Sequence, residues 1–128
     1  MSVSSLGYVG LGVTDSDAWA AFACDQLGLM RGVSSDGVTK LRLDSRDWRI
    51  ALHEGDEDDI IYAGFEVAST DALSDLENRL GEAGFPVKRG DAELLAARGV
   101  TDLVVAEDPA GMSVELFCGL KDLSLKHI

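Results

Sequence analysis

Residues 8–13 of the chain read YVGLGV, and residues 62–67 read YAGFEV, so that the pattern Tyr-x-Gly-x-x-Val occurs twice, 54 positions apart. In both segments apolar side chains alternate with small or polar ones, which is typical of a strand with one buried face. The pair Asp17-Ala18 recurs as Asp71-Ala72 at the same separation. The sequence therefore predicts an internal duplication whose two copies begin with equivalent strands.

The same order of elements surrounds each of these segments: one strand, one helix and three further strands. In the first copy a helix is predicted from a capping box at Thr14-x-x-Asp17 to a stop at Gly28. In the second, Ser69 or Thr70 caps a helix that Gly84 ends, and a short helix over 91–98 is inserted. The strands are predicted over 6–13, 30–34, 38–43 and 48–53 in the first copy, and over 60–67, 85–89, 101–107 and 112–118 in the second.

This order predicts an α+β fold of two βαβββ units, about 6–53 and 60–118, related by pseudo-twofold symmetry. One such unit cannot bury both faces of its sheet, whereas two can form a curved mixed sheet with the helices on its convex face. A single domain is expected over 1–119, with a linker or tail over 120–128.

Composition excludes several classes of partner. The 128 residues include 11 Lys and Arg against 23 Asp and Glu, a formal net charge of −12. Such a surface repels phosphate backbones and anionic lipid, so neither nucleic acid nor a membrane is an expected partner. Cys24 and Cys118 form no disulfide framework, which favours free thiols and a cytoplasmic location.

Strand alternation assigns a face to each side chain. Val9, Leu11 and Val13 should pack under the first helix, as should Trp48, Ile50 and Leu52. The apolar stripes of the two helices predict a core made by Trp19, Phe22, Leu27, Leu73, Leu76 and Leu80. The opposite face gathers corresponding positions of the two copies, and we expect a ligand-facing cavity there. Its residues are Tyr8, Ala51, Tyr62 and Glu115.

Together these features resemble the vicinal-oxygen-chelate superfamily, which includes glyoxalase I, bleomycin-resistance proteins and extradiol dioxygenases. The closer resemblance is to the non-catalytic N-terminal module of two-domain extradiol dioxygenases of the 2,3-dihydroxybiphenyl 1,2-dioxygenase type. It is carried by segments along nearly the whole chain. They are LGYVG at 6–10, GLM at 28–30, WRIA at 48–51, DDIIYAG at 58–64 and DPAGMSVE at 108–115.

The resemblance implies where a metal would be bound in a catalytic copy of this fold. The two His and one Glu ligands of the dioxygenases match the positions of Tyr8, Tyr62 and Glu115. A neutral phenol, with a pKa near ~10, is a poor ligand for Fe(II) at pH 7. We therefore expect no catalytic residue and no metal in this chain, and place Fe(II), or Mn(II) in some relatives, in a missing C-terminal module.

The resemblance implies a part of an oxidoreductase of aromatic-compound breakdown, inactive as these 128 residues alone. Its expected partners are the C-terminal catalytic module, further copies in a homo-oligomer, and a catecholic substrate in the full enzyme. The alternative is a stand-alone dimeric protein of the bleomycin-resistance type that binds an apolar, cationic drug or metabolite. A stand-alone metalloenzyme is disfavoured because three of its four ligand positions carry Tyr or Ala.

Overall fold

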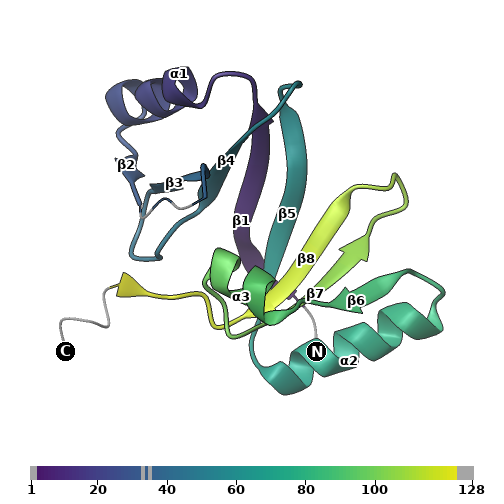
Figure 1. The fold of residues 1–128 in the computed structure, drawn as a ribbon. Coiled ribbons are helices and arrows are strands. Elements are labelled where there is room, and N and C mark those ends of the chain that lie inside the picture. The colour runs from purple at the N-terminus through teal and green to yellow at the C-terminus, as the bar shows by residue number, and fades with distance from the viewer. Residues whose placement is uncertain (1–2, 33, 35, 124–128) are drawn as a thin grey trace. The chain divides into compact units, whose positions relative to one another are not determined.

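In the computed structural model, which describes residues 3–32, 34 and 36–123, the chain forms two compact units (Figure 1). Among the described residues, the first unit comprises those within 8–61 together with 122–123, and the second comprises 3–7 and 62–121. Each contains the predicted order of one strand, one helix and three strands. The α+β class and the two βαβββ units are thus confirmed.

The first unit has the strand order β2-β3-β4-β1. The outer strands of this unit are β1 and β2. Only the part of β1 from Tyr8 on belongs to this unit, and β2 has two residues. β1 pairs with β4 in parallel, with Gly10 opposite Ala51, and the other pairings are antiparallel. The bounds are β1 (Val3–Val13), β2 (Met30–Arg31), β3 (Thr39–Arg42) and β4 (Ile50–Glu54).

The first helix, α1 (Ser16–Ala21), begins one residue later than predicted. Asp15 is its cap, because the Asp15 carboxylate accepts a hydrogen bond from the Ala18 backbone N–H. The backbone N–H of Thr14 instead donates to the Asp58 carboxylate at 2.9 Å. The prediction of a capping box at Thr14 is therefore wrong, and an aspartate one position on performs the same task.

The buried stripe of this helix also differs from the prediction. After Ala21 the chain continues as one π-helical stretch, η1 (Phe22–Gln26), whose wider turn shifts the side chains relative to the 3.6-residue period. Ala20 and Ala23 are fully buried, whereas Phe22 and Leu27 are 50% and 56% exposed. The core assignment of Phe22 and Leu27 is thus wrong, while Trp19 packs partly buried against the core.

The second unit repeats the arrangement with the strand order β5-β8-β7-β6, and β5 pairs with β8 in parallel. Gly64 lies opposite Glu115, as Gly10 lies opposite Ala51 in the first unit. Figure 1 shows helix α2 alongside this sheet. The bounds are β5 (Asp59–Val67), α2 (Thr70–Glu82), β6 (Val87–Arg89), α3 (Ala92–Arg98), β7 (Asp102–Glu107) and β8 (Ser113–Cys118).

The helix ends of the second unit follow the sequence signals. The Ser69 hydroxyl accepts from the Ala72 N–H at the start of α2, and Gly84 follows its end with a left-handed φ of 89°. The Asp91 carboxylate caps α3, and Gly99 follows its last residue with a left-handed φ of 69°. Under α2, Leu73 and Leu76 are buried against the strands, together with Val67, Val104, Leu116 and Cys118. The predicted apolar face of this helix is confirmed at Leu73 and Leu76, and Leu80 packs partly buried against the same cluster.

The end of the described chain is packed. Leu120 is buried, the Lys121 N–H donates to the Gly99 carbonyl, and the Leu123 N–H donates to the Ser45 carbonyl at 2.7 Å. Residues 124–128 of the predicted linker or tail lie outside the described residues. A domain boundary at 119 stays a prediction. In the described part of the chain, no helix is long and apolar enough to cross a membrane.

Candidate functional site

Glu115, the predicted acidic residue on the inner face of the second unit, forms a buried ion pair. Glu115 lies on β8 and its side chain is 3% exposed. Arg98, the last residue of α3, donates from Nε to Oε1 and from Nη2 to Oε2, both at 2.8 Å. This two-pronged geometry is the one in which a guanidinium binds a carboxylate most strongly. Both oxygens of Glu115 thus already accept a hydrogen bond from a cation within the chain.

The same guanidinium lies over Tyr62. The Arg98 Cζ is 4.0 Å from the centroid of the Tyr62 ring, which is a cation–π distance. Burial raises the pKa of the Tyr62 phenol far above its usual range, although the Arg98 charge acts in the opposite direction. Tyr62 is therefore a neutral phenol at pH 7, and the Arg98 guanidinium contacts both its ring and the Glu115 carboxylate.

The equivalent position of the first unit is filled by aromatic packing. Tyr8 and Trp48 are both fully buried, and their rings stack with centroids 4.3 Å apart. The Lys40 ammonium lies 5.0 Å from the centroid of the Trp48 ring. Ala51, which lies opposite Gly10, carries only a methyl group. Nothing at Tyr8 or Ala51 supplies the imidazole that a divalent transition metal prefers.

The prediction that Trp48 packs under the helix is wrong. Trp48 precedes β4, which starts at Ile50, so strand alternation does not govern its direction. Ile50 and Leu52, which do lie in the strand, belong to the core cluster beneath α1, as predicted. Trp48 instead packs on Tyr8, a side chain predicted to face away from the helix.

The metal that the resemblance implies does not fit the residues present. A catalytic iron needs about three protein ligands, two of them imidazoles, and open positions for its substrates. Here the three matching positions hold a stacked phenol, a neutral phenol and a carboxylate already bound by Arg98. Among residues 3–32, 34 and 36–123, no three His, Cys, Asp or Glu side chains are grouped so that they could hold a metal ion.

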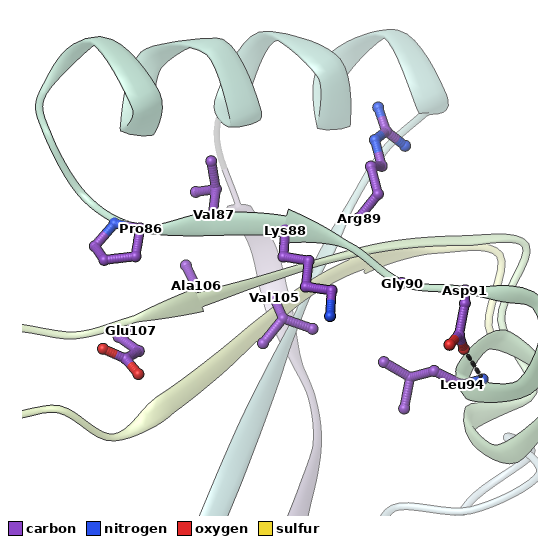
Figure 2. Close-up of a pocket in the computed structure, with 10 residues that line it drawn as sticks. All are labelled: Pro86, Val87, Lys88, Arg89, Gly90, Asp91, Leu94, Val105, Ala106 and Glu107. Atoms are coloured by element: carbon purple, nitrogen blue, oxygen red, sulfur yellow. Dashed lines mark hydrogen bonds between the residues drawn. The ribbon is translucent and has the colours of Figure 1, made fainter.

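The second unit also carries a hollow of about 410 Å³ between β6, β7 and the start of α3. Figure 2 shows Arg89 pointing from β6 toward α2 and Lys88 pointing to the opposite side of the strand. Arg89 forms ion pairs there with Glu77 and Asp102. The lining residues are Pro86, Val87, Lys88, Arg89, Gly90, Asp91, Leu94, Val105, Ala106 and Glu107.

Sequence reasoning placed Tyr62 and Glu115 on one face, and the structure brings both around one guanidinium. The ligand-facing cavity of Tyr8, Ala51, Tyr62 and Glu115 stays a prediction. The sequence did not predict a role for Arg98 at this site. The one feature that sets Arg98 apart in the sequence is its position at the end of the predicted helix over 91–98. A charge at the end of a short connecting helix gives no pattern from which its partner can be derived.

Comparison with known proteins relates these units to one class of enzyme. Residues 6–55 match the family model described as dihydroxybiphenyl dioxygenase BphC D1. The chain is 42% identical over 123 residues to a biphenyl-2,3-diol 1,2-dioxygenase of Paraburkholderia xenovorans, and 40% identical over 123 residues to a 3-methylcatechol 2,3-dioxygenase of Pseudomonas putida. Each alignment covers 96% of this chain.

Solved structures agree with the sequences. A catechol 2,3-dioxygenase matches 98% of this chain with a TM-score of 0.92 and 34% identity. The fold and the sequence are thus similar to one part of enzymes of the extradiol dioxygenase class. Within that class the likeness is to the dihydroxybiphenyl dioxygenase BphC D1 model, and it fits an N-terminal module.

The chain spans less than half the length of these relatives. It covers 41% of the Paraburkholderia enzyme, 42% of the Pseudomonas enzyme and 44% of the structurally similar catechol 2,3-dioxygenase. The likeness therefore concerns one module of proteins that are more than twice as long.

Proposed function

We propose that this chain is the non-catalytic N-terminal module of an extradiol ring-cleavage dioxygenase that acts in the breakdown of aromatic compounds. The observation that carries the proposal is the coverage: 96% of this chain aligns with only 41% of a biphenyl-2,3-diol 1,2-dioxygenase. In this function a catecholic substrate is opened with oxygen by the whole protein, of which this chain forms one part.

The contacts that Glu115 and Tyr8 already make within the chain support a non-catalytic role. Glu115 is bound by Arg98, and Tyr8 is stacked on Trp48, so neither offers a free ligand. The metal of the enzyme then belongs to a C-terminal module, as Fe(II) or Mn(II). Support for iron comes from a relative with 35% identity, named iron-dependent extradiol dioxygenase, from Rhodococcus jostii.

The proposed partners are the C-terminal module and further copies of the protein. Large apolar side chains are exposed on this chain, and contact with another folded surface would remove them from water. The most exposed are Leu6, Leu27, Met30 and Leu43. In this proposal the domain ends near 119, residues 120–128 are a linker or tail, and the two free cysteines suit the reducing cytoplasm.

Oxygen uptake tests the proposal. The purified chain is loaded anaerobically with Fe(II), and catechol-dependent oxygen consumption is then recorded. We expect none, whereas the protein encoded by an extended reading frame should consume oxygen. Uptake by the 128 residues alone would contradict the proposal, as would a natural stop after Ile128 combined with tight binding of an apolar cation, the property of the drug-binding alternative.

A matched pair of variants in the longer protein separates catalysis from folding. Glu115→Gln removes the inner carboxylate charge but keeps its shape, and Glu107→Gln makes the same change on an exposed strand end. If this module is non-catalytic, both variants retain kcat as long as they fold. A folded Glu115→Gln protein without ring cleavage, beside an active Glu107→Gln protein, would show that Glu115 acts in the reaction.

A further inference from the structure

Arg98, Glu115 and Tyr62 form a buried cluster whose cation comes from the chain itself, a feature that the proposed function does not require. We infer that Arg98 is a resident cation of the second unit, which occupies the space between the Glu115 carboxylate and the Tyr62 ring and thereby excludes a divalent metal ion from it. The inference concerns this unit alone and holds or fails independently of the dioxygenase function.

The Arg98 guanidinium contacts both of the other two groups. The Arg98 Nε and Nη2 atoms each lie 2.8 Å from a Glu115 oxygen, and the Arg98 Cζ lies 4.0 Å from the Tyr62 ring centroid. The Arg98 side chain is only 14% exposed. A cation that is bound by the carboxylate and lies over the ring takes up the position in which a metal ion would contact both groups.

The Arg98 guanidinium also neutralises the charge of Glu115. A carboxylate buried like that of Glu115 is costly without a cation, and a guanidinium in bidentate contact satisfies both of its oxygens. A guanidinium has no vacant coordination position, so it neutralises the charge without offering a site to substrate or water. The unit is therefore complete without an external ion at this position.

Local structure holds Arg98 in place. Helix α3 is fixed at its start by the Asp91 cap and at its end by the left-handed Gly99, directly after Arg98. The backbone N–H of Gly99 donates to the Leu95 carbonyl at 2.8 Å. The helix thus holds the Arg98 guanidinium at a defined position against β8. The positive charge therefore comes from the segment that connects β6 to β7.

Metal binding tests this inference. The variant Tyr62→His adds an imidazole beside Glu115, and the double variant Tyr62→His/Arg98→Ala also removes the guanidinium. Zn(II) and Co(II) are titrated into each protein by calorimetry and by Co(II) visible absorption. We expect the double variant to bind at least tenfold more tightly than Tyr62→His alone, with a stoichiometry of one.

The matched control is Tyr62→His/Arg79→Ala. It makes the same change in net charge at an exposed position of α2, and it should bind no more tightly than Tyr62→His. Addition of Glu115→Gln to the Arg98→Ala double variant should abolish the gain. Equal affinity of Tyr62→His and Tyr62→His/Arg98→Ala would overturn the inference, as would an equal gain in the Arg79→Ala control.

Folding is a separate readout, because the loss of Arg98 leaves a buried carboxylate. If the Tyr62→His/Arg98→Ala chain is unfolded in a chelator, Zn(II) should refold it, as followed by circular dichroism, since binding to the native state stabilises it. Failure of saturating Zn(II) to refold that variant, while the Arg79→Ala control stays folded, would also overturn the inference.

Discussion

The rings of Tyr8 and Trp48 stack at a centroid separation of 4.3 Å, with an interplanar angle of 27°. The contact links β1 to the segment immediately before β4, which is the strand that pairs with β1 in parallel. Directly after this stack, the Val9 N–H donates to the Arg49 carbonyl at 2.9 Å. Aromatic packing and backbone pairing therefore fix the same junction of the first unit.

The first prediction concerns this stack. Trp48→Ala should lower the free energy of unfolding by about 3–5 kcal/mol, because it removes a fully buried indole and leaves a cavity beside Tyr8. Trp48→Phe keeps an aromatic face and should cost clearly less. Urea denaturation followed by circular dichroism measures both. Equal losses for the two variants would show that ring stacking does not matter at this position.

The second prediction concerns the close approach of Gly7 to Phe117 within the second unit. A Cβ on Gly7 would lie 2.2 Å from Cζ of Phe117, whose side chain is fully buried and has little room to move. Gly7→Ala should therefore destabilise the chain by roughly 1–3 kcal/mol. Thermal unfolding of the purified variant provides the measurement.

Gly55→Ala is the matched control for this change. A Cβ at Gly55 meets no atom within 4 Å, and the backbone there has no left-handed φ. The same substitution should shift stability by less than about 0.5 kcal/mol. A Gly7→Ala chain as stable as the Gly55→Ala chain would mean that Phe117 can move aside.

These two contacts show where sequence reasoning reached its limit. The repeated Tyr-x-Gly-x-x-Val segments correctly predicted equivalent strands. Alternation assigned Trp48 to the wrong face, because the strand begins only at Ile50. The alternation of side chains between two faces holds within a strand, but it does not apply to residues that precede the strand.

The candidate site shows a second limit. That Glu115 is buried on the face of Tyr62 follows from the strand pattern, whereas its pairing with Arg98 does not. Arg98 reaches Glu115 from a helix 17 residues away. The direction of such a connection depends on tertiary packing, which no local periodicity records. The π-helical turn at Phe22 was hidden for the same reason, since nothing in the apolar spacing distinguishes it from an α-helix.

The third prediction compares two leucines on the helices. Leu73 of α2 is fully buried, and Leu73→Ala should cost about 2–5 kcal/mol in free energy of unfolding. Leu27 follows the π-helical turn and is 56% exposed, so Leu27→Ala should stay within about 0.5 kcal/mol in the isolated chain. Chemical denaturation of both variants distinguishes the buried helix face from the exposed one. A large loss of stability in Leu27→Ala would contradict the exposed position of Leu27 after the π-helical turn.

The fourth prediction is a dependence on alkaline pH. Burial raises the folded-state pKa of Tyr62 above its unfolded value of about 10. The proton is therefore bound more tightly in the folded chain, and the associated stability is fully present below pH 10 and is lost as the pH rises above it. Between pH 9 and pH 11 the loss from this one group should be about 1 kcal/mol.

Tyr62→Phe isolates this contribution, because it keeps the ring under the Arg98 guanidinium but removes the titrating proton. The free energy of unfolding is measured by denaturant titration at pH 9 and pH 11 for both proteins. The wild-type chain should lose about 1 kcal/mol more than Tyr62→Phe over this interval. Tyrosinate absorbance should rise for this residue only on unfolding. Parallel losses in the two proteins would show that Tyr62 ionises freely in the folded state, and hence that its phenol lies in water rather than beneath Arg98.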